Sequence, residues 1–360
     1  MKPAERDKFV SATLQTYIER AVSGDGPAGD RYKHERKVLE QMIPIATDGF
    51  RGVTLTAIMG KLVREDINTG TEFSSINPRG VYERGIRPVL RHFRIPSSGS
   101  APLNVAKNVQ VLDEKWAEGR KPESAARAAV EYIRMINRHW ADPSHRDDLI
   151  MIFIQRLVRY ADEVAAHDVE LAPIDEIPPI TLGKRLAKFA LAYPEGGSMP
   201  QFVVGTIIAA ARSSDADFSP LQGVDASVFG TNTTSNKPAD LWETLATGNF
   251  GNLYEVTCKK VDENRLDAAV DAFSKLGVPT TPITFICRIP ADCASLPVDD
   301  GVVTHRGMPF QFIDLASFIE INFTLLTADK RLLVLQQISS FVTDPARAVK
   351  TKQGWAASFG

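Results

Sequence analysis

Asp240 and Glu255 are the two residues of this sequence whose types and spacing could support catalysis. Each lies in a short apolar run, 239–245 or 253–258, and the turn-forming stretch 248–251 separates the two runs. Such runs around a Gly-rich turn predict a β-hairpin, which would bring both carboxylates to one edge of a sheet. Carboxylate oxygens beside a basic group can hold Mg²⁺ and let it act on a phosphodiester. The pair therefore predicts metal-dependent hydrolysis.

The lysines that follow the second run could supply the basic group. Side chains alternate along a strand, so Glu255, Thr257 and Lys259 would share one face while Lys260 points to the other. Lys259 would lie about 13 Å from Glu255 along an ideal strand. Its long stem, or a bulge at Cys258, would have to bring the ammonium back to the carboxylates. We therefore expect Lys259 to be the functional lysine and Thr257 to orient a water molecule.

The elements around the acidic pair follow one another in a specific order. A helix comes first, then the hairpin with Asp240 and Glu255, then a helix over 264–273 and an apolar strand over 283–288. An Asp and a Glu on neighbouring strands also occur by chance in many α/β proteins. The whole order, however, resembles the core of the PD-(D/E)xK nucleases across roughly residues 185–315.

This resemblance implies roles for individual residues. In the family the Asp and the Glu hold Mg²⁺, and a lysine two residues after the Glu positions the attacking water. Asp240, Glu255 and the main-chain carbonyl of Val256 would accordingly be the metal ligands. The usual lysine position is occupied by Thr257, which is a departure from the family pattern. Lys259 would then be a lysine displaced by two places.

A basic segment, residues 79–107, lies in the first half of the chain. Its basic residues, Arg79, Arg84, Arg87, Arg91, Arg94 and Lys107, stand against the single acid Glu83. Such a stretch is often only a solvated face. The surrounding region, 68–102, is however a predicted long loop rich in Gly and Pro, and long loops in compact domains are often functional. Arginines suit phosphate binding and bidentate reading of guanine. The residues expected to contact DNA are Arg79, Arg84, Ser98, Asn104 and Lys107 in this half, and Asn236, Lys237 and Lys260 beside the hairpin.

The two halves of the chain have different patterns of apolar residues. The first is mostly helical, with helices predicted over 8–22, 37–45, 54–64, 105–116, 122–140 and 147–166. The Pro-rich stretch 169–181 is the predicted linker. Strands and helices then alternate, with helices over 201–212, 265–276 and 328–341 and further strands over 284–288 and 310–313. We therefore predict an α/β (α+β) protein: a mainly helical DNA-recognition domain, 1–180, and a nuclease domain, 181–360, with a mixed sheet flanked by helices.

The composition excludes several classes of protein. The chain of 360 residues is 44% hydrophobic and nearly neutral, with 42 Lys and Arg against 44 Asp and Glu. It is long enough for two cores but carries no overall basic signature for nucleic acid. Cys258, Cys287 and Cys293 form neither a disulfide framework nor a zinc motif and are expected to be reduced thiols. No apolar run reaches the length of a membrane span, and the charged start does not fit a signal peptide. A cytoplasmic protein is expected.

The size and the helical front half are most similar to those of the type II restriction endonucleases, with a likeness to the SacI group in 104–108 and 112–117. The resemblance implies cleavage of double-stranded DNA at a short sequence, by a homodimer because a palindromic site has two symmetric halves. A cognate DNA methyltransferase would protect the host without binding the enzyme. Two alternatives stay open: a repair or structure-specific nuclease on the same core, and a catalytically inactive DNA-binding module.

Overall fold

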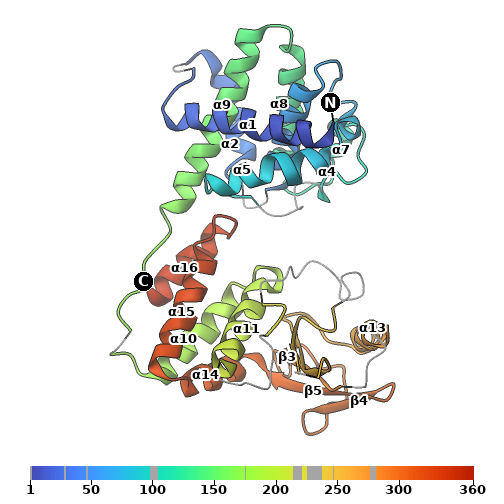
Figure 1. The fold of residues 1–360 in the computed structure, drawn as a ribbon, viewed down its shortest axis with the longest axis vertical. Coiled ribbons are helices and arrows are strands. Elements are labelled where there is room, and N and C mark those ends of the chain that lie inside the picture. The colour runs from blue at the N-terminus through green and yellow to red at the C-terminus, as the bar shows by residue number, and fades with distance from the viewer. Residues whose placement is uncertain are drawn as a thin grey trace. The chain divides into compact units, whose positions relative to one another are not determined.

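The computed structural model describes residues 2–27, 30–45, 48–97, 104–174, 176–213, 221–224, 237–245, 247–275 and 281–360. The chain divides into two compact units, Met1–Asp168 with Asp344–Val349 and Val169–Thr343 with Lys350–Gly360 (Figure 1). The first unit is helical, and the second holds a mixed sheet flanked by helices. The predicted α+β class is therefore confirmed. The separate functions of 1–180 and 181–360 stay predictions.

The first unit is built from helices that pack around α3. Its longer helices are α1 (Pro3–Val22), α2 (Lys33–Met42), α3 (Gly49–Val63), α8 (Glu123–Arg138) and α9 (Pro143–Ala165). Along α1 the buried residues Val10, Leu14 and Ile18 recur at every fourth position and form one apolar face. In α3, by contrast, every residue from Gly49 to Lys61 is buried. This pattern places α3 inside the core and α1 on its surface.

The region 68–102, predicted to be a long loop, is largely helical as far as His92. It contains η2 (Phe73–Ile76), α4 (Pro78–Gly80), the π-helix η3 (Val81–Ile86) and α5 (Arg87–His92). Proline breaks a helix interior, but Pro78 stands in the first turn of α4, where the missing N–H costs nothing, and Pro88 stands where the π-helix η3 gives way to α5. The Asn77 side chain caps α4 by accepting from the Gly80 N–H at 3.3 Å. The loop prediction was wrong for this reason.

The helix predicted over 105–116 is also wrong. Only the short α7 (Glu114–Ala117) forms among the described residues 104–117. The backbone before it bonds instead to a neighbouring segment: the Leu112 N–H donates to the Gly70 carbonyl at 2.7 Å, and the Phe73 N–H donates to the Gln110 carbonyl at 2.9 Å. These tertiary hydrogen bonds override the local helical pattern.

The described residues of the second unit form one five-stranded sheet with the order β1-β2-β3-β5-β4. The strands are β1 (Leu241–Thr244), β2 (Phe250–Val256), β3 (Ile283–Cys287), β4 (Val302–His305) and β5 (Met308–Asp314). β2, β3 and β5 run parallel, while β1 and β4 are antiparallel to their neighbours. The carboxyl ends of β2, β3 and β5 therefore meet at the edge of the sheet where β1 begins.

Helices cover both faces of this sheet (Figure 1). One face packs on α11 (Ser198–Arg212) and α14 (Leu315–Leu325), and α10 (Pro179–Ala192), α15 (Ala328–Val342) and α16 (Val349–Phe359) complete the same core. The other face packs on α13 (Glu263–Ser274), which connects β2 to β3. Alternation along the strands separates the two layers: Leu241, Val256 and Ile286 belong to the first core, and Leu253 and Phe285 to the second.

The second unit also contains the predicted linker and the three cysteines. The predicted linker 169–181 ends inside α10, because Pro179 stands in the first turn of that helix. Cys258, Cys287 and Cys293 are all free, as expected for reduced thiols. Among the residues described, no helix is both long and apolar enough to cross a membrane.

Candidate active site

The β1–β2 hairpin brings Asp240 and Glu255 together. The strands pair antiparallel, with Leu241 opposite Tyr254, so that Asp240 stands level with Glu255. The Val256 N–H donates to Asp240 Oδ2 at 3.1 Å, and the Asp240 side chain also hydrogen-bonds to that of Glu255. The predicted hairpin is confirmed, but its strands do not begin and end at the predicted residues. β2 begins at Phe250, inside the stretch 248–251 that was predicted to be the turn.

Glu255 points to the face of the sheet that α13 covers, because its chain neighbour Val256 points to the opposite core. Asp240 lies just before β1, and its Oδ2 faces the Val256 N–H. Glu255 pairs across the parallel register with Phe285, which belongs to the core beneath α13. The side chain of Glu255 is consequently buried, with an exposed fraction of 6%.

Burial and neighbouring charges act on this pair in opposite directions. Burial raises the pKa of the Asp240 carboxyl, and this rise is opposed by the Val256 N–H, by the charges of Arg265 and Lys237, and by the bond to Glu255. Glu255 forms an ion pair with Arg265, whose Nη2 lies 3.5 Å from Glu255 Oε2. A buried and a half-buried carboxyl side by side would be stabilised by a further cation.

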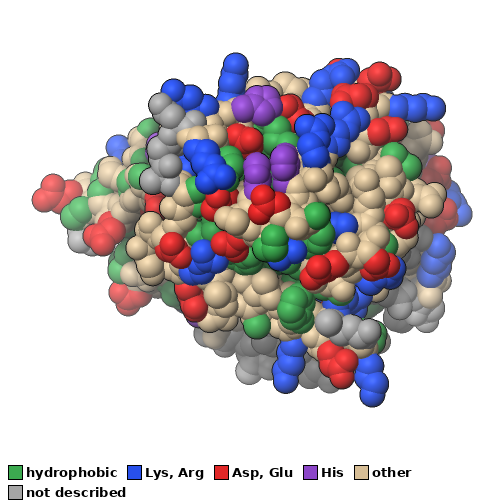
Figure 2. All heavy atoms as spheres, turned by 90° about the horizontal axis from the view of Figure 1, so that it is seen from above, with side chains coloured by type: hydrophobic (Ala, Val, Ile, Leu, Met, Phe, Trp, Pro, Cys, Tyr) green, Lys and Arg blue, Asp and Glu red, His purple; other side chains and the backbone are tan. Residues whose placement is uncertain are grey.

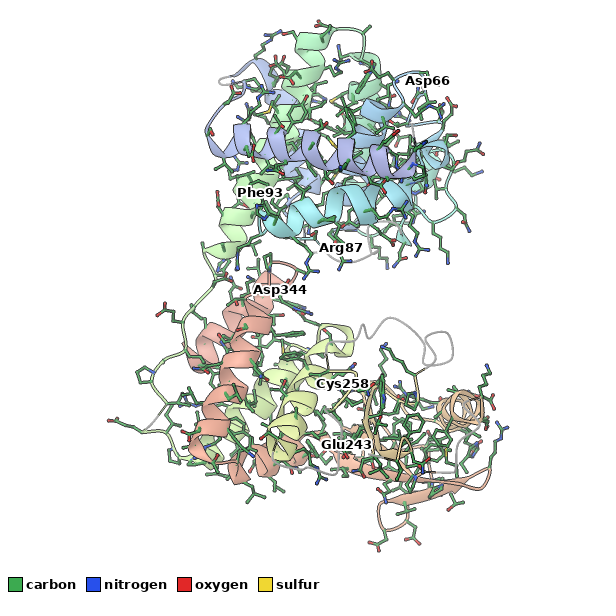
Figure 3. All side chains as sticks on the ribbon, in the orientation of Figure 1. Asp66, Arg87, Phe93, Glu243, Cys258 and Asp344 are labelled. Atoms are coloured by element: carbon green, nitrogen blue, oxygen red, sulfur yellow. The ribbon has the colours of Figure 1, made fainter. Side chains whose placement is uncertain are left out.

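A pocket of about 190 Å³ opens beside the pair. It is lined by Pro194, Gly196, Gly197, Gln201, Asp240, Val256, Thr257, Cys258, Lys259 and Arg265. Cys258, labelled in Figure 3, marks the place where the chain leaves β2. Asp240, Lys259 and the end of β2 therefore all border the same pocket.

Lys259 reaches this pocket because β2 ends early. The strand stops at Val256, and the chain bends at Cys258 and Lys259. The hydroxyl of Thr257 accepts a hydrogen bond from the Lys259 N–H at 3.0 Å and so stabilises the bend. This bend takes the place of a bulge at Cys258. Lys259 lines the pocket with Asp240 instead of extending along the strand.

Gln201 is a site residue that sequence reasoning missed. It lies on α11 with an exposed fraction of 2%, and its Nε2 donates to the carbonyls of Gly223 and Asp240 at 2.9 and 3.4 Å. Its Oε1 is buried and has no hydrogen-bond partner among the described residues. The only available signal was an amide at the start of the apolar run 201–212. Gln201 fixes the backbone from which the Asp240 carboxylate projects.

Arg265 is the second missed residue. It stands in the first turn of α13, where Asp262 caps the helix by accepting from the Arg265 N–H. Its guanidinium carbon lies 6.0 Å from the ring centroid of Phe285. Asp262 followed three residues later by Arg265 is a recognisable helix start, but nothing local indicates that the arginine reaches the acidic pair.

The structure describes the surroundings of six of the predicted DNA-contacting residues. In the first unit, Arg79 and Arg84 are 74% and 56% exposed and pair with Glu83 at 3.1 Å and Asp7 at 2.7 Å. Asn104 and Lys107 are exposed, and the face drawn in Figure 2 has basic and acidic side chains interspersed. In the second unit, the charge of Lys237 opposes the rise in the pKa of Asp240, and Lys260 forms an ion pair with Asp262 at 3.6 Å. Ser98 and Asn236 lie outside the described residues.

The donor atoms at the acidic pair fit a hard divalent cation. Among the described residues, no group of three or more His, Cys, Asp or Glu side chains could hold a metal ion. The available set is two carboxylates and a main-chain carbonyl at Val256, which suits Mg²⁺ because it prefers oxygen ligands and keeps several waters. Partial burial raises the pKa of the Asp240 carboxyl, which is consistent with a place for added positive charge.

No family model matches the chain, and no curated protein matches it either.

Proposed function

We propose that this chain is a Mg²⁺-dependent endonuclease of the PD-(D/E)xK class that acts as a type II restriction enzyme on double-stranded DNA. The observation that carries the proposal is the contact between the half-buried Asp240 and the buried Glu255, with Asp240 and Lys259 lining the same pocket. A purely structural acidic pair would need no open pocket, and a pair on the surface would not leave Glu255 buried. The combination favours a site that binds a cation and a phosphate group.

Individual residues would divide the work of phosphodiester hydrolysis. Asp240, Glu255 and the Val256 carbonyl would hold Mg²⁺, which when bound supplies charge neutralisation for the scissile phosphate and lowers the pKa of coordinated water. Lys259 would orient the attacking water and stabilise charge on the phosphate. Thr257, although buried, holds the bend that presents Lys259. Thr257 would therefore act by positioning the lysine.

The remaining parts of the proposal concern DNA and assembly. Arg79, Arg84, Asn104 and Lys107 would contact the duplex from the first unit, and Lys237 and Lys260 would do so beside the hairpin. Two copies of the chain would act on a palindromic site, one on each half. The enzyme would work in the cytoplasm, where a DNA methyltransferase of the same specificity protects the host. Arg79, Arg84 and Lys260 already pair with acids, so contact with DNA would have to replace or join these ion pairs.

Digestion of unmethylated DNA of known sequence, with Mg²⁺ and with mapping of the ends, tests the proposal. We expect discrete fragments from the natural protein and intact DNA from Asp240→Asn and Glu255→Gln. These substitutions keep shape and hydrogen bonding but remove charge. Fragments without a sequence preference would favour the repair-type nuclease. Intact DNA from a natural protein that still binds it would favour the inactive binding module and contradict the proposal.

A further inference from the structure

Arg265 is the side chain near the acidic pair whose position the proposed chemistry leaves unexplained. Its main chain is fixed by the Asp262 cap at the start of α13, and its guanidinium lies over the buried ring of Phe285. Nη2 points to Glu255 Oε2, while 30% of the side chain stays exposed and lines the pocket. Arg265 therefore touches both the buried acid and the open space beside it.

The contact between Arg265 and Glu255 is loose. At 3.5 Å it is much longer than the 2.6 Å between Arg288 Nη2 and Asp292 Oδ1 in the same unit, where the guanidinium also uses Nε. The charge of Arg265 acts on Asp240 as well. A guanidinium that contacts one carboxyl at 3.5 Å and whose charge also acts on a second is a counter-ion that can be exchanged.

Binding of a divalent cation would change this balance. A cation held between Asp240 and Glu255 would lie within a few ångströms of the guanidinium, and like charges at such separations repel strongly in a partly buried site. Arg265 would leave Glu255 but remain anchored by its helix and by the Phe285 ring. Its planar set of donors would then face the pocket, and such a set matches the oxygens of a phosphate.

We propose that Arg265 is an exchangeable counter-ion, which neutralises Glu255 before a divalent cation binds and contacts a DNA phosphate afterwards. This inference rests on the proposed nuclease function and adds to it a residue that couples metal binding to DNA binding. The exchange explains why an arginine, which cannot be deprotonated, stands beside a metal site. It also predicts opposite effects of one substitution on two ligands.

Arg265→Gln tests the exchange by calorimetric titration with Ca²⁺, which occupies oxygen sites and can be used without turnover. Without DNA, the variant should bind Ca²⁺ about tenfold more tightly than the natural protein, because a competing charge is gone. With DNA, the gain in DNA affinity on adding Ca²⁺ should be reduced by a similar factor. Arg265→Lys keeps the charge but not the planar donors, so it should retain the natural Ca²⁺ affinity and lose part of the gain.

Arg306→Gln is the matched control. Arg306 also pairs with α13, through Asp267 at 3.2 Å and Asp271 at 2.9 Å, but it does not line the pocket. It should change neither measurement. Unchanged or weaker Ca²⁺ binding in folded Arg265→Gln would overturn the exchange. If the natural protein binds no divalent cation and cuts no DNA, the proposed nuclease function itself is wrong. That result differs from the one that overturns the exchange alone.

Discussion

The sheet edge at Asp240 and the arginine-bearing helices from Pro78 to His92 both carry charges predicted to meet DNA, but the protein stabilises these charges in different ways. At the sheet edge the buried Glu255 lies beside the half-buried Asp240 and faces a loose guanidinium at 3.5 Å. On the helices, Arg79 and Arg84 are exposed and already paired with acids. Burial makes a charge sensitive to every neighbour, whereas exposed pairs are screened by water. Large functional effects are therefore expected at the sheet edge and small ones on the helices.

Lys259→Ala should give the largest effect that sharpens this contrast. A positioned group that assists proton transfer or charge stabilisation contributes about 100-fold or more to a rate, so cleavage should fall by at least about 100-fold. Lys260→Ala is the control, because Lys260 is exposed and paired with Asp262. It should weaken DNA binding and leave the single-turnover rate unchanged. Equal rates for Lys259→Ala and the natural protein would move the functional lysine elsewhere.

Gly223→Ala should disturb the sheet edge through the backbone. Gly223 has φ +89°, and a Cβ there would lie 2.1 Å from the Asp240 carbonyl oxygen. Gly248 on the hairpin turn has φ +84° but open space around it. Gly248→Ala therefore measures the cost of backbone strain without a steric clash. We expect losses in the free energy of unfolding of about 1 kcal/mol at Gly248 and about 3 kcal/mol at Gly223. Urea unfolding measures both; similar losses would show that Gly223 does not support Asp240.

The pH dependence of stability probes the burial of Asp240. Because the folded state raises the pKa of this carboxyl, its contribution to stability is fully present below the ordinary value of 3.8 and is lost as pH rises through the folded pKa. The free energy of unfolding of the natural protein should therefore fall relative to that of Asp240→Asn as pH rises from 3.8, by about 1.4 kcal/mol for each unit of pKa difference. Parallel curves would contradict the burial. Mg²⁺ should restore the loss in the natural protein alone.

Arg84→Ala should give the smallest effect. Arg84 is 56% exposed and its partner Asp7 keeps a second ion pair with Arg6, so the loss of stability should be about 1 kcal/mol or less. A lost phosphate contact would lower the slope of log affinity against log salt concentration by about 0.9. Arg64→Ala is matched, since Arg64 is similarly exposed and pairs with Asp66 at 2.8 Å. A slope that changes equally in both variants would remove Arg84 from the DNA surface.

The same contrast explains how far the sequence predicts the molecule. The hairpin could be predicted because alternation and the turn glycine at 248 are local signals. The bend that returns Lys259 to the pocket depends on the Thr257 hydroxyl, and strand alternation alone does not predict it. Gln201 and Arg265 could not be found, since each is distant in sequence from one or both acids and is brought to the pair by packing of α11 and α13. In the helical region, Pro78 indicated a loop, whereas in the structure it stands in the first turn of the helix α4.

The most direct test is calorimetric titration of the natural protein with Mg²⁺, beside Asp240→Asn and Glu255→Gln. The contact of the buried Glu255 with the half-buried Asp240 at an open pocket predicts saturable Mg²⁺ binding in the natural protein. It also predicts loss of that binding in both variants while they remain folded. Saturable binding that survives in both variants would place the cation elsewhere. Absence of binding in the natural protein would contradict the metal site on which the proposed nuclease rests.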